Sequence, residues 1–149
     1  MSAAPEELDA LALENQVCFA LAVAARSVIG LYRPLLEPLG LTHPQYLVML
    51  ALWGDEPLSV TDLSEKLALD PGTLSPLLKR LEAQGYLERR RVPGNERTLA
   101  VTLTDAGRTL RADAERIPPA VVERLGMPVE ELLRLHADLS AVIAAARTE

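Results

Sequence analysis

Apolar residues recur every three, four or seven positions along roughly residues 5–38, which is the spacing of one face of an α-helix. The recurring positions are Leu8, Leu11, Cys18, Leu21, Ala25, Val28 and Tyr32. Pro34 and Pro38 follow, and because proline kinks or ends a helix, we expect this first helix to stop near residue 38.

Capping signals predict three further helices along the chain. In LTHPQY, Thr42 can cap a helix with Gln45 as its capping-box partner, and that helix should reach about residue 54. Ser59 and a carboxylate three residues later predict a short helix that ends near residue 69. Asp70, followed by proline, and Gly85 bound the next helix. Two short helices joined by a tight turn form a helix-turn-helix.

The segment after this motif alternates in the manner of strands. YLERRRV and RTLAVTLT flank the turn PGNE, and apolar residues occupy every second position of the latter segment. A hairpin directly after a helix-turn-helix makes a winged helix. We therefore expect a mainly α fold with a small β-hairpin wing, as one domain over 1–149 with the winged-helix region at about 42–110.

Helical patterns at both ends of the chain lie outside this winged helix. They cover about residues 5–38 and 118–147, and a compact winged helix does not need them. Their apolar faces must be buried somewhere, and a symmetric homodimer is the commonest solution.

Charge is unevenly distributed along the chain, which has a net charge of −6. Residues 61–111 hold nine Lys or Arg and seven Asp or Glu, whereas the remainder holds six and fourteen. A basic patch on an acidic body fits double-stranded DNA, and a winged helix used for protein contacts is the alternative. We expect base contacts from Thr73, Ser75 and Pro76, contacts to phosphate or guanine from Lys79 and Arg80, and wing contacts from Arg89, Arg90, Arg91 and Arg97.

Cys18 is the only cysteine, so no disulfide can form within one chain. We expect a reducing cytoplasm, and no membrane association because the apolar run from Val17 to Ala25 is short. His43 and His136 show no zinc spacing, so we expect no metal and no cofactor. A lone thiol is either a small core residue or a sensor, and spacing alone leaves both open.

The order of elements, together with LTDAGR and NERTLAVTLT, resembles the MarR family of regulators. ENQVCFAL, LYRPLLEPLGLTHPQYLVMLALW and LDPGTLSPLLKRLEAQGYLERRR resemble its organic hydroperoxide resistance branch. The resemblance implies a homodimeric repressor, not an enzyme, that binds a pseudo-palindromic operator. It implies that Cys18 reacts with an organic hydroperoxide and that Tyr32 hydrogen-bonds the sulfur across the dimer. It also makes Arg97 the wing arginine that enters the minor groove.

The chain departs from the branch at three positions. His43 stands where the family often has a second tyrosine, Ala22 where some members have a tyrosine, and Asn95 where an acidic residue braces the wing arginine. Hydrogen bonds from Tyr32 and His43 can stabilise a thiolate. An oxidised Cys18 has no second cysteine to resolve it, so an external low-molecular-weight thiol is one expected partner. Three alternatives stay open: a ligand-switched repressor with a structural Cys18, a thiol peroxidase, and a module that does not bind DNA.

Overall fold

The computed structural model describes residues 9–147, apart from the side chains of Glu96 and Arg97. The chain divides into two compact units, one that ends at Ala114 and one that begins at Glu115. Leu8 lies outside the described residues, as do both ends of the expected single domain. We describe each unit by itself.

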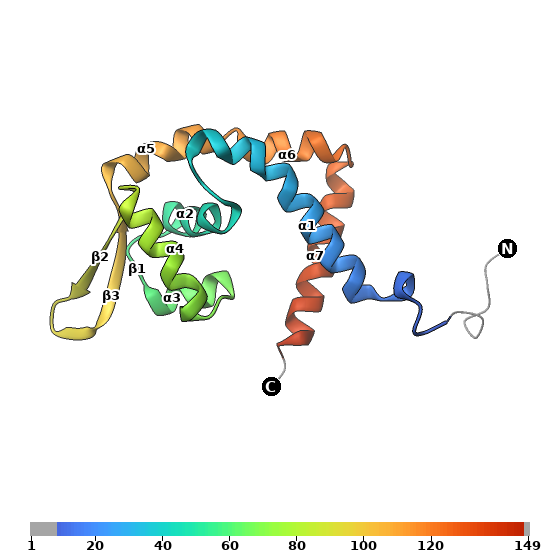
Figure 1. The fold of residues 1–149 in the computed structure, drawn as a ribbon, viewed down its shortest axis with the longest axis horizontal. Coiled ribbons are helices and arrows are strands. Elements are labelled where there is room, and N and C mark those ends of the chain that lie inside the picture. Colours follow the sequence, from blue (N-terminus) through green and yellow to red (C-terminus); the bar gives the residue numbers. More distant parts are fainter. Residues whose placement is uncertain (1–8, 148–149) are drawn as a thin grey trace. The chain divides into compact units, whose positions relative to one another are not determined.

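The first unit contains the winged helix, and it confirms the expected fold class (Figure 1). Its elements after residue 42 are α2 (His43–Gly54), β1 (Leu58–Ser59), α3 (Val60–Leu67), α4 (Pro71–Ala83), β2 (Leu87–Val92), β3 (Asn95–Leu103) and α5 (Asp105–Ala114). The strands form one antiparallel sheet in the order β1-β3-β2. Strand β1 was not expected, because two residues carry no alternation and pair only with the distant β3.

The caps predicted from the sequence hold these helices in place. Thr42 and Gln45 form a complete capping box at the start of α2, and Ser59 and Asp62 form another at α3. Asp70 accepts a hydrogen bond from the backbone N–H of Thr73 at 2.8 Å. Beyond α4 the chain turns at a glycine with φ of 85°, which is the predicted stop at residue 85.

The core of the winged helix is built mostly from leucine. Side chains that are almost fully buried come from α2, α3, α4 and the sheet, so a single apolar centre fixes how these elements pack. They include Val48, Met49, Leu52, Leu63, Leu74, Leu78, Leu81, Leu87 and Val101.

The first helix starts later than the hydrophobic pattern predicts. Helix α1 spans Val17–Leu36, after a 3₁₀ turn η2 at Leu13–Asn15, and a second 3₁₀ turn η3 covers Glu37–Leu39. The expected start at residue 5 is wrong, because polar side chains just before α1 bind the backbone that a longer helix would use. The Nδ2 of Asn15 donates to the carbonyl of Asp9 at 2.8 Å, and the Nε2 of Gln16 donates to that of Ala10 at 2.6 Å.

The second unit contains α6 (Ile117–Leu125) and α7 (Val129–Ala146). Gly126 separates them in a left-handed conformation, with φ of 65°. The region expected as 118–147 is therefore two helices.

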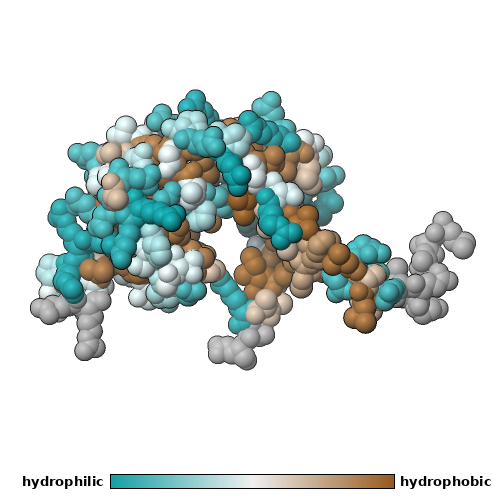
Figure 2. Space-filling model, in the orientation of Figure 1, coloured by the Kyte–Doolittle hydropathy of each residue, from teal (hydrophilic) through white to brown (hydrophobic). Residues whose placement is uncertain are grey.

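Both units carry apolar helix surfaces that face solvent. Brown, hydrophobic side chains lie along α1 and along α7 (Figure 2). On α1 only Leu36 is buried, and on α7 no residue is. By length and composition alone, Val17–Leu39 could cross a membrane, with a mean hydropathy of 1.4. The expectation that the apolar run is too short is wrong on that measure, although core helices of soluble proteins meet it too.

Candidate functional site

Helix α4 presents a polar face above a buried apolar stripe. Leu74, Leu78 and Leu81 are fully buried. The opposite side holds the residues expected to read DNA: Thr73, Pro76, Lys79 and Arg80 are exposed and Ser75 is half-buried. The Thr73 hydroxyl donates to Asp70 at 3.1 Å, so the helix cap also orients a side chain on the reading face.

Two side chains that the sequence analysis did not single out fix the far end of α4. The Nε2 of Gln84 donates to the carbonyl of Gly40 at 2.7 Å, and the Gln84 Oε1 accepts from Gln45 at 3.2 Å. The Tyr86 hydroxyl donates to the carbonyl of Leu39 at 3.2 Å. These bonds tie α4 to the segment between α1 and α2. No local pattern could have revealed them, because their partners lie about 40 residues away.

The expected wing arginines do not share one role. Arg89 is half-buried and pairs with Glu82 of α4 at 2.9 Å. Arg90 is exposed and pairs with Glu88 at 2.8 Å, and Arg91 is exposed. Arg97 lies in β3, but its side chain is outside the described part of the chain. The hairpin therefore carries cations on both faces, with one of them bracing α4.

A network around Glu56 holds the base of the wing. Its carboxylate accepts the backbone N–H of Leu103 at 3.0 Å and two bonds from Arg108, at 3.1 and 3.2 Å. The hydrogen bond from the Arg108 side chain is the main cause that lowers the pKa of Glu56 below its usual value. Trp53 donates from Nε1 to the carbonyl of Gly107 at 2.9 Å. The end of α2 and the start of α5 thus position β3 between them.

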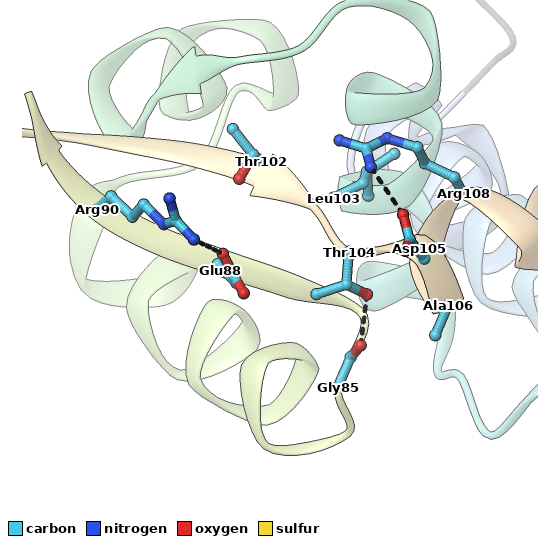
Figure 3. Close-up of a pocket in the computed structure, with 9 residues that line it drawn as sticks. All are labelled: Gly85, Glu88, Arg90, Thr102, Leu103, Thr104, Asp105, Ala106 and Arg108. Atoms are coloured by element: carbon cyan, nitrogen blue, oxygen red, sulfur yellow. Dashed lines mark hydrogen bonds and ion pairs between the residues drawn. The ribbon is translucent and has the colours of Figure 1, made fainter.

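Beside this network lies an open hollow of about 590 Å³ (Figure 3). Its two guanidinium groups already have carboxylate partners, since Arg90 pairs with Glu88 and Arg108 with Asp105. The Thr104 hydroxyl donates to the carbonyl of Gly85 at 2.6 Å across the same hollow. The hollow is a structural junction, because its charges are balanced.

Cys18 is exposed and is the second residue of α1. It therefore lies in the first helical turn, where unpaired backbone N–H groups favour negative charge. The helix start expected from the sequence lies a dozen residues earlier and would put Cys18 several turns into the helix. The side chain is not buried within the chain, so a core-filling role would require another molecule to cover it.

Tyr32 and His43 lie together, one on α1 and the other at the start of α2. Their rings meet edge to face with centroids 4.8 Å apart, and Tyr46 lies 5.8 Å from Tyr32. Burial lowers the pKa of His43, so its imidazole is neutral at neutral pH. Burial, followed by the charge of Tyr32, raises the pKa of Tyr46.

A groove of about 370 Å³ opens next to these rings, between the end of α1 and the start of α2. Its walls are mainly apolar, with Arg33 and Glu37 as the charged groups. The lining residues are Ile29, Arg33, Leu36, Glu37, Leu41, Thr42, His43 and Pro44.

The structure does not bring Cys18 to this cluster. Cys18 and Tyr32 are fourteen residues apart on one continuous helix. At about 1.5 Å per residue, their backbones are separated by roughly 21 Å along the axis. A contact between the two side chains within one chain is therefore excluded.

Known proteins resemble this chain over nearly its whole length. A MarR family model matches residues 41–99. The organic hydroperoxide resistance transcriptional regulator of Bacillus subtilis is 39% identical over 92% of this chain and 93% of its own. The HTH-type transcriptional regulator TtmR of Methylorubrum extorquens is 43% identical over 90% of this chain and 69% of its own.

Solved structures of known proteins also align with most of this chain. AbfR of Staphylococcus epidermidis is 32% identical. Its reduced form bound to DNA aligns with a TM-score of 0.75 over 91% of this chain and 95% of AbfR. A disulfide form of AbfR aligns with a TM-score of 0.64 over 90% of this chain and 91% of AbfR.

Proposed function

Because the chain belongs to the MarR family of winged-helix transcriptional regulators, which are not enzymes, we propose that it is a repressor that organic hydroperoxides switch off by oxidising Cys18. One observation carries the proposal: the single thiol stands exposed in the first turn of a helix whose other end holds Tyr32 against His43. The similarity to the hydroperoxide regulator of Bacillus subtilis supports the choice of signal.

The DNA-reading surface in this proposal consists of α4 and the wing. Thr73, Ser75 and Pro76 meet base edges in the major groove, and Lys79 and Arg80 contact phosphate or guanine. Arg90, Arg91 and Arg97 contact the backbone or the minor groove, and Arg89 holds the wing against α4 through Glu82. The similarity of the fold to AbfR bound to DNA supports this assignment.

We propose a homodimer whose helices at the two ends of the chain cover one another. Both α1 and α7 expose large apolar side chains, which a second copy can bury. They are Val17, Phe19, Val23 and Ile29 on α1, and Val129, Leu133, Leu135, Val142 and Ile143 on α7. An antiparallel neighbour would also bring Cys18 of one copy to Tyr32 of the other, which the distance of about 21 Å forbids within one chain. Because such a regulator acts on DNA, we infer that it is cytoplasmic.

The chemistry is a two-electron oxidation of the thiol. The sulfur attacks the terminal oxygen of the hydroperoxide, the O–O bond breaks, and an alcohol leaves while Cys18 becomes a sulfenic acid. The sulfur of an external low-molecular-weight thiol then attacks the sulfenic sulfur, the S–O bond breaks and water leaves, which gives a mixed disulfide, because the chain has no second cysteine. The added group lies at the proposed interface between close-packed helices, so it changes the spacing of those helices. With that spacing changes the distance between the two α4 helices, one in each copy.

The test is fluorescence anisotropy of a labelled promoter fragment during titration with cumene hydroperoxide. We expect the wild type to release DNA, and Cys18→Ser to bind equally well and to ignore the peroxide. Release from Cys18→Ser at the same peroxide concentration would refute the proposal and favour a repressor switched by a ligand in the groove between α1 and α2. Sedimentation of the wild type as a monomer at micromolar concentration would refute the dimer.

A further inference from the structure

Three polar rings meet where α1 passes the start of α2, and their polar atoms have no partner among the described residues. The ring centroids of Tyr32, His43 and Tyr46 lie between 4.8 and 6.3 Å apart. Within residues 9–147 no hydrogen bond ties either hydroxyl or either imidazole nitrogen to another residue. Nor are these atoms sealed from water, since only the Ser64 hydroxyl is buried without a partner among the described side chains. The cluster therefore presents donors and an acceptor that are free for an incoming molecule.

His43 differs from the other two rings because it can both take and give a proton near neutral pH. It is the first residue of α2, directly after the capping residue Thr42, and its half-buried ring lines the apolar groove. Burial lowers the pKa of the imidazole, so at neutral pH one nitrogen carries a lone pair and the other a proton. A thiol that enters this cluster meets a base with no competing hydrogen bond.

We propose that His43 carries the proton during oxidation of Cys18 from a second copy, a role that rests on the proposed function. The imidazole takes the proton of the thiol, and the thiolate sulfur attacks the terminal oxygen of the hydroperoxide. The S–O bond forms as the O–O bond breaks, and the alkoxide leaving group takes the proton back from the imidazolium. Thiol and hydroperoxide thus become sulfenic acid and alcohol, with His43 unchanged at the end.

The other charged and titratable groups around His43 do not compete for this role. Tyr32 and Arg33 face it from α1, Glu37 from η3 and Tyr46 from α2. Phenol, guanidinium and carboxylate groups ordinarily titrate outside pH 5.5–8.5. In that range the imidazole and the thiol are the groups whose protonation changes, so the pH profile of oxidation reports on the pair.

The experiment measures the rate of oxidation of Cys18 by cumene hydroperoxide between pH 5.5 and 8.5. Sulfenic acid is trapped with dimedone and quantified by intact mass in the full-length protein, and the DNA affinity of each reduced protein is measured in parallel. Wild type is compared with His43→Gln, with His43→Phe, which keeps a ring against Tyr32, and with His136→Gln as a matched control on exposed α7.

We expect the wild-type rate to change by no more than about threefold between pH 8 and the pKa of the His43 imidazole, and to fall only below that pKa. Above it the neutral imidazole takes the proton of the Cys18 thiol, so the reaction does not wait for the thiol to ionise unaided. In both His43 variants the rate should fall about tenfold per pH unit, as it does for a thiol that must ionise unaided. Near pH 6.5 the difference should reach about a hundredfold, a typical contribution of general acid–base catalysis. His136→Gln should follow the wild type.

The outcomes separate the two proposals. If wild-type Cys18 is oxidised but both His43 variants keep the wild-type pH profile, then His43 carries no proton, even if the rates are uniformly lower. If wild-type Cys18 forms no dimedone adduct at any pH, the peroxide-sensing function itself is wrong, and the role of His43 falls with it.

Discussion

Replacement of Gly107 by alanine tests how tightly the base of the wing is built. Gly107 lies in the first half of α5, where the helix passes the carbonyl of Tyr86 at the end of the turn after α4. An added Cβ would overlap the carbonyl oxygen of Tyr86 and lie 3.1 Å from its carbon and 3.3 Å from Cδ2 of Leu103. A carbon and an oxygen normally approach to about 3.3 Å, so the two backbones must separate by roughly 1 Å.

Three effects set the size of the change. Overpacking of this kind costs about 1–3 kcal/mol. Separation also strains the hydrogen bond from the N–H of Thr104 to the Tyr86 carbonyl, 3.1 Å long, which contributes about 1 kcal/mol. Alanine regains about 0.5–1 kcal/mol of helix propensity over glycine. The clash outweighs the propensity, and the free energy of unfolding should fall by about 1–3 kcal/mol.

Urea denaturation at fixed protein concentration measures this decrease, with far-UV circular dichroism and the fluorescence of Trp53 as probes. Trp53 is the only tryptophan and donates to the carbonyl of Gly107, so it reports on the junction itself. The matched control is Gly54→Ala, at the exposed end of α2, where an added Cβ meets nothing within 4 Å. The control should equal or exceed the wild type in stability. If Gly107→Ala is as stable as Gly54→Ala, the close approach of α5 to Tyr86 does not exist in the molecule.

Two further substitutions test the wing. Glu56→Gln should lower the free energy of unfolding by about 1 kcal/mol at pH 7, since the hydrogen bonds from Arg108 to a carboxylate are stronger than those to an amide. Those bonds lower the pKa of Glu56, so the carboxylate stabilises the fold above the usual glutamate value of 4.5 and ceases to do so as the pH falls through the lowered pKa. Urea denaturation should therefore show the difference from wild type shrinking below that pH, and a difference that grows there would contradict the assignment. Arg97→Ala should weaken DNA binding, and each phosphate that this side chain neutralises should account for roughly 0.9 of the logarithmic salt slope, as measured by anisotropy across a salt series. A slope equal to that of the wild type would show that this side chain neutralises no phosphate.

The elements that sequence analysis predicted well are those whose signals are local. The capping boxes at Thr42 and Ser59 and the sharp bounds of the helix after Asp70 depend on residues three or four apart, and the structure confirms each. The hairpin followed from strict alternation around a short turn, and its pairing is also confirmed. In each case one hydrogen bond or one buried face decides the conformation.

The features that sequence analysis missed depend on partners far along the chain. Glu56 accepts hydrogen bonds from Leu103 and Arg108, about fifty residues later in the chain, and no sequence pattern near Glu56 predicts these contacts. The same holds for strand β1, which pairs with β3 across about forty residues. The predicted start of α1 was wrong for another reason. Apolar spacing continues upstream of Val17, but the side chains of Asn15 and Gln16 donate hydrogen bonds to the backbone of that segment. Periodicity reports which face is apolar, whereas such side-chain bonds decide where the helix begins.

The late start of α1 changes the position of Cys18 in the helix and the backbone groups that surround it. In a helix that began near residue 5, Cys18 would lie in a middle turn, where every backbone N–H is already bonded. In α1 as it stands, Cys18 lies in the first turn, among backbone N–H groups that have no partner within the helix, and its side chain is exposed. Fourteen residues onward, nearly four full turns, Tyr32 lies on nearly the same face of the helix but about 21 Å away. Shared periodicity therefore places both residues toward one neighbouring surface without letting them touch each other. An antiparallel copy of α1 along that face would set each thiol beside the other chain's Tyr32 and His43, so a symmetric pair would contain two equivalent sites.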